Sequence, residues 1–405
     1  MGKAPRQNPA FAGIALAGGQ RTPFGDFGKS LKDVPLSSLG VHATKAALAK
    51  AGLEAEKVDH LVFGNTAPVD PDGLFISRKV ALGAGLPIES AAMQVVRACG
   101  TGSQAIVSAA TQIATGHSEL AVAAGAENYS RVPFINTDMR WGRGRGPSVM
   151  VDQLDHIYRC PFSSALMGET AEELTRRHQY RREAMDDWGY MSQMRAKVAQ
   201  ESGFLAKQIA PVDVPDGKGG KTRRFAADEF PRPTITREKL ATLKPAFKEG
   251  GQVTAGNSSG VTDGAAAIVV GDIARLQREG VRPEARIVDF AVAGVEPAIM
   301  GAGPVPAIQK LLERTEIAVS DIDYFEINEA FAVVNLHAEQ QLGIPRDVTN
   351  LYGGGISIGH PPGATGIRMT MTAMHHLADT GGRYAIVSMC LGSGMGMATL
   401  IERLH

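Results

Sequence analysis

Two stretches of the chain resemble one another at a fixed spacing, and this internal repeat constrains the fold more than any other feature. Residues 53–63 match residues 317–327 at an offset of 264 positions. Each stretch follows an expected helix and leads into a segment with an asparagine, Asn65 in the first and Asn328 in the second. Because a sequence repeat indicates a repeated structural unit, we expect two similar halves.

A second match indicates that the first copy is interrupted. Residues 263–268 resemble residues 395–400 at an offset of only 132 positions, so the first copy contains an insertion. At the larger offset Cys99 corresponds to Gly363, three residues after His360. Two halves related by a pseudo-twofold axis would therefore place Cys99 and His360 near that axis.

Short apolar runs alternate with helical patterns along both halves. Residues 102–114 carry apolar side chains at the spacing of a buried helix. The expected strands are residues 11–17, 58–63, 91–96, 120–125 and 265–270, and the expected helices are 39–51 and 102–114. This alternation predicts an α/β fold with helices packed on a sheet.

The character of the chain changes after Gly125, where charge and turn residues become frequent. A charged helical pattern covers residues 167–200, and we interpret the region as an insertion with helices and a hairpin of its own. We predict a discontinuous N-terminal half (residues 1–126 and 253–283), an inserted loop domain (127–252) and a C-terminal half (284–405).

Charge and cysteine content exclude several classes of protein. The 42 Lys and Arg residues balance 42 Asp and Glu residues, which argues against nucleic acid or an anionic membrane as the main partner. No apolar run is long enough for a membrane span and no secretory signal is recognisable. Three cysteines cannot form a disulfide framework, so we expect a reducing, cytoplasmic location and chemical roles for any special cysteine.

Two residues stand out as candidates for chemistry. Cys99 ends an expected strand and precedes a helix, where the helix dipole favours a thiolate; the alternative is a cysteine that only packs in the core. His360 lies in a glycine-rich stretch before another helix, whose positive end favours a neutral ring that can act as a base. The alternative for His360 is a residue that caps its own turn.

Further polar residues lie at strand ends. Cys390 closes an apolar strand before alternating glycines, which let backbone amides approach a ligand oxygen. Asn328 follows a strand and could hold a water or a carbonyl, although a turn asparagine is the simpler interpretation. Cys160 has no such setting and is expected to pack. Residues 220–222 lack the context of a phosphate loop, and no metal-binding motif is recognisable.

Four motifs together resemble those of the thiolases. They are Cys99-Gly-Thr-Gly-Ser-Gln-Ala, Asn328-Glu-Ala-Phe, Gly359-His-Pro-Pro-Gly and Cys390-Leu-Gly-Ser-Gly. Matching segments follow in order over nearly the whole chain. The resemblance implies a duplicated five-layer α/β/α/β/α core with a loop domain inserted in the first half.

The resemblance also implies roles. Cys99 would carry the acyl group, His360 would activate it, and Cys390 would move a proton at the α-carbon of acetyl-CoA. Asn328 would position the water of one oxyanion hole, and the backbone amides of Cys99 and Gly392 would form the other. Coenzyme A and acyl-CoA would be substrates, with no permanently bound cofactor. The inserted loop domain (127–252) would bind coenzyme A. The residues that match coenzyme A contacts are Met167, Ala255, Ser259, Ala330 and Phe331, with Arg232 near the adenine end.

The chain departs from the family pattern beside these motifs. Leu166 stands where acetoacetyl-CoA thiolases carry histidine, which favours a general 3-ketoacyl-CoA thiolase linked to fatty-acid β-oxidation over an acetoacetyl-CoA-specific biosynthetic one. Two further alternatives are a decarboxylating ketoacyl synthase and a non-catalytic protein that binds acyl-CoA or lipid. We expect a homodimer or homotetramer, with other β-oxidation enzymes as further candidate partners.

Overall fold

The computed structural model describes residues 4–217 and 220–405. Its main strands form one hydrogen-bonded path in the order β12-β13-β14-β11-β1-β10-β5-β3-β4. The first half supplies β1 (Ile14–Arg21), β3 (His60–Gly64), β4 (Ala91–Val95), β5 (Leu120–Glu127) and β10 (Thr262–Asp272), and the second supplies β11 (Ala285–Gly294), β12 (Tyr324–Ile327), β13 (Tyr384–Leu391) and β14 (Met395–Arg403). The short β2 (Gly25–Asp26) pairs with β10. The halves join where β1 pairs with β11 at Ala15 and Leu16.

The repeat expected from the sequence is present in the strands. The offset of 264 carries β3 onto β12 and β5 onto β13. In each half these two strands pair in parallel, and the next strand, β10 or β14, pairs antiparallel. The two halves therefore share one topology.

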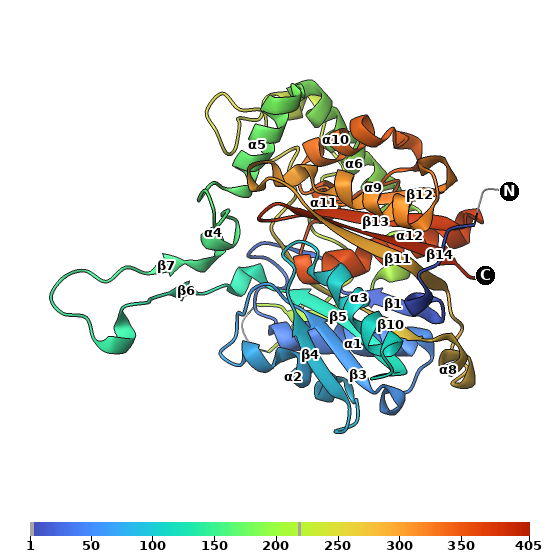
Figure 1. The fold of residues 1–405 in the computed structure, drawn as a ribbon. Helices are drawn as coiled ribbons and strands as arrows, with labels where there is room; N and C mark the ends of the chain where they lie inside the picture. Colours follow the sequence, from blue (N-terminus) through green and yellow to red (C-terminus); the bar gives the residue numbers. More distant parts are fainter. Residues whose placement is uncertain (1–3, 218–219) are drawn as a thin grey trace.

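Helices and sheets alternate in five layers (Figure 1). The outer helices are α1 (Leu36–Ala51) and α2 (Ile76–Ala84) on the first half, and α9 (Pro304–Thr315) and α10 (Ala332–Leu342) on the second. The central helices α3 (Thr101–Ala114) and α12 (Pro362–Thr380) lie between the strands of the first half and those of the second. Three buried apolar clusters fill the interfaces, one around α3 and α12 and one on each outer side. This arrangement is the expected duplicated α/β/α/β/α core.

A pair of glycines lets the two central helices meet. Gly102 of α3 and Gly366 of α12 are equivalent in the repeat. A Cβ on Gly102 would lie 2.9 Å from the backbone nitrogen of Gly366, and one on Gly366 would lie 2.2 Å from that of Ser103. Neither contact is possible for a real side chain, so the close crossing requires glycine at both positions.

The two halves differ most in one connection. Residues 128–261 join β5 to β10, whereas residues 392–394 join β13 to β14. The long connection contains α4 (Gln153–Ile157), α5 (Met167–His178), α6 (Arg182–Glu201), α7 (Arg237–Ala241) and the strand pairs β6 (Phe134–Ile135) with β7 (Val151–Asp152) and β8 (Val212–Pro215) with β9 (Thr222–Phe225). The short helices α8 (Ile273–Arg278) and α11 (Gly355–Ile358) lie outside it.

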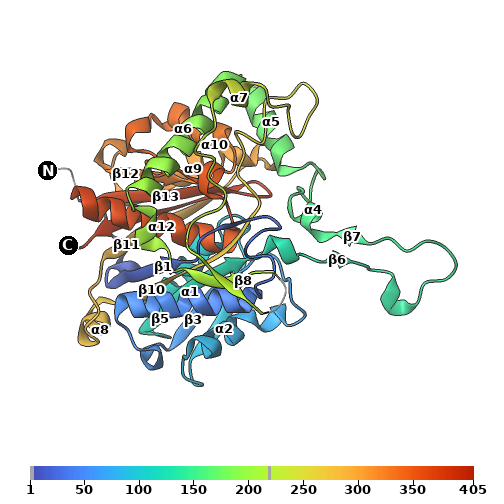
Figure 2. The ribbon, with the colours of Figure 1, turned by 180° about the vertical axis from the view of Figure 1, so that it is seen from behind.

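This long connection spreads over both halves. Its helices α5 and α6 contact α10 of the second half, while apolar residues of β8 and β9 join the outer core of the first half, on the side seen in Figure 2. The segment with β6 and β7 extends away from the body as an arm (Figure 1).

The expected first strand begins too early. Residues 11–17 do not form one strand, because Pro9–Phe11 is a turn of 3-10 helix and β1 begins at Ile14. Asn8 caps this turn by accepting the Ala10 N–H, and Pro9 suits its first position. The helical pattern over 167–200 is confirmed and forms the two helices α5 and α6, with Gln179 in the left-handed conformation between them.

Within the described ranges, none of the helices is both long enough and apolar enough to cross a membrane.

Candidate active site

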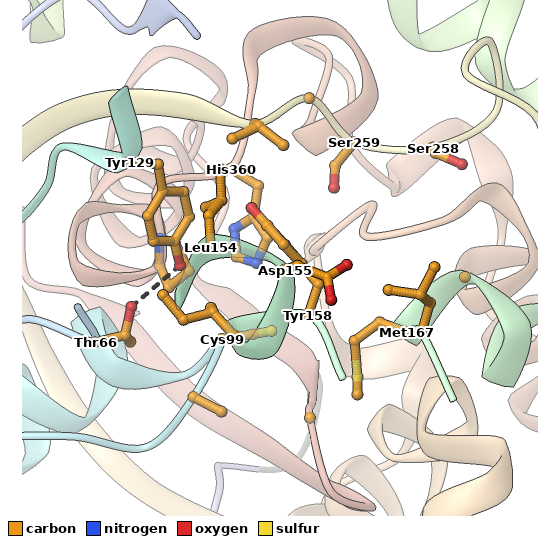
Figure 3. A pocket seen from close by; sticks show the side chains of 18 of the residues that line it. Thr66, Cys99, Tyr129, Leu154, Asp155, Tyr158, Met167, Ser258, Ser259 and His360 are labelled. Carbon is orange, nitrogen blue, oxygen red and sulfur yellow. Dashed lines mark hydrogen bonds between the residues drawn. The ribbon is translucent and has the colours of Figure 1, made fainter. Parts of the chain in front are cut away.

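A cavity of about 410 Å³ opens where the two halves and the long connection meet. The first half contributes Thr66, Ala98 and Cys99, and the second half contributes Phe331, His360, Pro362 and Gly392. The long connection supplies Tyr129, Asp152, Leu154, Asp155, Ile157, Tyr158, Leu166, Met167, Gly168, Phe247, Ser258, Ser259, Gly260 and Val261. Figure 3 shows Cys99 and His360 facing this space from opposite elements. The structure thus brings the two expected reactive residues together.

Cys99 is held by a strained turn before α3. Ala98 has φ 43°, a conformation that a non-glycine residue adopts rarely. Thr101 stabilises the turn, because its hydroxyl accepts the Arg97 N–H at 2.8 Å and donates to the Ala98 carbonyl at 2.7 Å. The turn directs the Cys99 thiol into the cavity.

Burial raises the pKa of the Cys99 thiol, although the backbone N–H groups of Gly392 and of Cys99 itself act in the opposite direction. Desolvation disfavours the charged form more than these donors favour it. The helix start therefore does not by itself make Cys99 a thiolate, and Cys99 needs a base to become nucleophilic.

His360 is arranged as a neutral base. Its Nδ1 lies 2.7 Å from the Thr365 hydroxyl, which itself donates to the Pro361 carbonyl at 2.9 Å. Thr365 must therefore accept a hydrogen from Nδ1, which leaves Nε2 unprotonated. Burial, with a contribution from Arg368, lowers the pKa of His360 to about 3. Nε2 has no hydrogen-bond partner among the described residues, so it is free to accept a proton.

Cys390 is not among the residues that line the cavity. The residue is fully buried in β13, and burial followed by the charge of Cys99 raises the pKa of its thiol. The coupling between the two thiols indicates that they are neighbours. A thiol kept protonated in this way can donate a proton but does not compete with Cys99 as a nucleophile.

Asn328 is buried and has no hydrogen-bond partner for either side-chain polar atom within the described chain. Its backbone is fixed, because its N–H donates to the Ser388 carbonyl at 2.9 Å. The next residue, Glu329, accepts hydrogen bonds from Trp188, Ser192 and the Ile356 N–H. An unsatisfied buried amide costs free energy, which is consistent with a bound water or substrate oxygen as its missing partner.

Only some of the residues expected to contact coenzyme A line the cavity. Met167, Ser259 and Phe331 line the cavity, whereas Ala255, Ala330 and Arg232 do not. The Ala330 carbonyl accepts the Ser259 N–H at 2.9 Å and so supports the wall from behind.

Arg232 points elsewhere. Its guanidinium donates to Asp26 at 3.1 Å and to the carbonyls of Glu229 and Phe230. About half of the side chain is exposed. In this arrangement Arg232 does not face the cavity.

Sequence reasoning missed several polar residues that line the cavity, among them Thr66, Tyr129 and Tyr158. The hydroxyls of Thr66 and Tyr129 lie 3.1 Å apart (Figure 3). The Tyr158 ring packs edge-on against Tyr129, with 5.8 Å between centroids. No local motif marks these residues, since the folding of distant segments brings them together.

Across the part of the chain described, no cluster of three metal-binding side chains is present.

Two family descriptions match the chain. The thiolase N-terminal domain matches residues 14–272 and the thiolase C-terminal domain matches residues 281–403. Together they cover nearly the whole chain, and so the protein belongs to the thiolase family.

Relatives that are named as thiolases are similar to this chain over almost its whole length. The chain is 41% identical to a beta-ketothiolase of Cupriavidus necator over 392 residues, which cover 96% of this chain and 99% of the relative. It is 37% identical to the mitochondrial 3-ketoacyl-CoA thiolase of Homo sapiens over 396 residues, which cover 96% and 98%. The crystal structure of that human enzyme superposes with a TM-score of 0.95 at 36% identity, covering 98% of this chain and all of that one.

A second structure of the human enzyme, in complex with CoA, superposes with a TM-score of 0.94. The protein is accordingly a thiolase, an acyltransferase that uses coenzyme A as a substrate. Membership of this family decides against the decarboxylating ketoacyl synthase.

Proposed function

We propose that the protein cleaves 3-ketoacyl-CoA with coenzyme A through an acyl-Cys99 intermediate, and that it also runs the reverse condensation. The observation that carries this proposal is His360, whose Thr365 contact leaves an unprotonated Nε2 in the same cavity as the Cys99 thiol. A protonated thiol beside a free imidazole nitrogen is the arrangement that nucleophilic catalysis requires.

The steps follow from these groups. His360 takes the thiol proton, and the Cys99 sulfur attacks C3 of the substrate. The bond between C2 and C3 then breaks, and its electron pair goes to the enolate of acetyl-CoA. Cys390 donates its proton to C2 of this enolate, and acetyl-CoA leaves. The thiol of a second coenzyme A gives its proton to Cys390 and attacks the acyl group. The bond between the acyl carbon and the Cys99 sulfur breaks, the sulfur takes back the proton held by His360, and the shortened acyl-CoA leaves.

Oxygen atoms that become negatively charged during the reaction need hydrogen-bond donors. The N–H groups of Cys99 and Gly392, which already point at the Cys99 sulfur, would form one oxyanion hole. His360 and a water held by Asn328 would form the other. One such donor is worth about 10²–10³ in rate.

Brief exposure to acetyl-CoA tests the first step. We expect an acetyl mass adduct on the peptide that contains Cys99, and none on that peptide in Cys99→Ala. An adduct on Cys390 or Cys160 instead would contradict the assignment.

We further propose that coenzyme A enters beside Met167, Ser259 and Phe331, with Ala255 and Ala330 behind them and the residues of the inserted region forming much of the site. Arg232 would serve the phosphate end only if a phosphate displaced Asp26, which now holds it.

Apolar side chains line much of the cavity, and we infer that they favour acyl chains longer than four carbons. Leu154, Ile157, Leu166 and Val261 line it, and each buried methylene gains about 0.8 kcal/mol. We therefore propose a general 3-ketoacyl-CoA thiolase. The test is kcat/KM for thiolysis across 3-keto chain lengths, and a steep fall from four to six carbons would instead favour an acetoacetyl-CoA-specific enzyme.

We propose that the protein forms a homo-oligomer. Large apolar side chains of the arm are exposed, among them Met139 at 62% and Trp141 at 87%, and β4 is the last strand of its sheet. Exposed apolar surface and an open strand edge both favour association. Light scattering should give a dimer or tetramer mass, and removal of residues 137–148 should lower it if the arm takes part.

Two catalytic thiols also suit a reducing compartment such as the cytoplasm, and thiol labelling in cell fractions would test that location.

A further inference from the structure

A buried carboxyl group that the proposed steps do not use lies directly behind the cavity. Glu127 is the last residue of β5, and its exposed fraction is zero. Its oxygens accept the Asn65 side-chain amide at 2.9 Å, the Thr66 N–H at 2.6 Å and the Thr66 hydroxyl at 2.7 Å. The backbone N–H groups of Ala67 and Gly363 also face it.

These donors come from both halves of the molecule. Asn65, Thr66 and Ala67 follow β3 of the first half, whereas Gly363 is in the first turn of α12, three residues after His360. We call the contact between Gly363 and the backbone of Gly64 and Ala126 the seam. It is tight, since a Cβ on Gly363 would lie 2.5 Å from the Gly64 carbonyl and 2.8 Å from that of Ala126. A buried carboxyl group is costly and persists only where donors compensate it. Glu127 therefore joins the half that carries Cys99 to the helix that follows His360.

Glu127 also reaches the cavity through hydroxyl groups. The Thr66 hydroxyl has one hydrogen, which it donates to Glu127. Its contact with Tyr129 at 3.1 Å must then be donated by the tyrosine. Thr66 and Tyr129 both line the cavity, so Glu127 determines how the hydroxyls of that wall are oriented.

We propose that Glu127 is a positioning residue for acyl transfer, which holds the start of α12 and orients the Thr66–Tyr129 wall. The inference rests on the proposed reaction at Cys99. Because the cavity-lining contacts Met167, Ser259 and Phe331 lie on other elements, loss of Glu127 affects the chemical step and not the binding of coenzyme A.

The first test is Glu127→Gln, which keeps the size of the side chain but turns one acceptor into a donor facing N–H groups. We expect kcat for thiolysis to fall at least about tenfold, as for a buried donor left without its acceptor, with KM for coenzyme A changed less than about twofold. The matched control is Asp59→Asn at the opposite end of β3 and β5, where Asp59 accepts the Glu119 N–H at 2.8 Å. This variant should lose stability but keep its kcat.

A second pair of variants isolates the hydroxyl chain. Thr66→Val keeps the backbone contact to Glu127 and removes the link to Tyr129, so kcat should fall about threefold or more. Thr66→Ser restores a hydroxyl and should recover most of the wild-type kcat. A merely structural role of Thr66 would not depend on the hydroxyl in this way.

The outcomes separate the two proposals. A folded Glu127→Gln with wild-type kcat overturns the positioning role. If that variant does not fold, equal kcat in Thr66→Val and Thr66→Ser overturns it instead. If wild-type Cys99 takes no acetyl group, the proposed reaction itself is wrong, whereas acetylation of Cys99 with unaffected variants removes only the role of Glu127.

Discussion

The ends of β5 and β13 are equivalent in the repeat, yet they contact the opposite half in different ways. Glu127 ends β5 and meets the backbone of Gly363 at the start of α12. Leu391 ends β13 and packs on Gly100 at the start of α3, where a Cβ would lie 2.6 Å from its side chain. One contact is polar and the other apolar, although the two strands are equivalent in the repeat. A duplicated scaffold thus keeps its shape while its two copies take different chemistry.

The same divergence separates Cys99 from its counterpart Gly363. The first half places a thiol at this point, and the second half leaves no room for any side chain. The base comes from the second half, so neither copy is sufficient alone. The predictions below test this division of labour.

The largest effect should come from Cys99→Ala. If the first half alone supplies the nucleophile, thiolysis of acetoacetyl-CoA should fall at least about 10⁴-fold. Cys160→Ala is the control, because Cys160 is buried outside the cavity and should lose less than about twofold. Substantial activity left in Cys99→Ala would mean that Cys390 can replace it, and the comparison would fail.

Gly363→Ala should weaken the protein where Cys99 has its counterpart. The added methyl group would meet backbone on both sides, 2.5 Å from the Gly64 carbonyl. We expect a loss of about 1–3 kcal/mol or more in the free energy of unfolding, measured by urea denaturation. Gly294→Ala, whose added methyl group has open space, should be nearly neutral. Equal stabilities would show that the seam can relax.

The base should affect stability in acid. The pKa of His360 is lowered to about 3, so the unfolded chain binds more protons than the folded one between that value and about 6.5. Stability therefore falls as the pH falls through this window, by about 1.4 kcal/mol per unit. His360→Gln should lack this part of the slope in denaturation measured from pH 7 to 5. Parallel slopes in the two proteins would contradict a buried neutral imidazole.

The smallest effect should come from Arg232→Ala. To contact a phosphate, Arg232 would exchange its exposed pair with Asp26 for another exposed ion pair. Such a pair is worth less than about 1 kcal/mol, so coenzyme A binding should weaken fivefold or less. Binding of a truncated pantetheine thioester, which lacks the phosphates, should not change. Calorimetry with both ligands gives the comparison, and equal losses would exclude a phosphate contact.

The sequence was sufficient for the features that depend on local pattern. The offset of 264 predicted which strands correspond. Strand ends beside glycine singled out Cys99 and Cys390, and a glycine-rich stretch before a helix singled out His360. It could not reveal Glu127, because its five donors come from segments far apart in the chain. The tautomer of His360 needed the Thr365 distance, and the raised pKa of Cys99 reflects burial, which no motif records.

The unequal connections also affect how the chain folds. Residues 392–394 make β13 and β14 a local hairpin, of a kind that forms in about 1–10 μs. Closing the connection of residues 128–261 costs about 3 kcal/mol more in chain entropy. During synthesis β5 would wait on the order of ten seconds for β10 to leave the ribosome. Through that interval one edge of β5 is unpaired, so the nascent first half is the part of the molecule most exposed to aggregation and most dependent on chaperones.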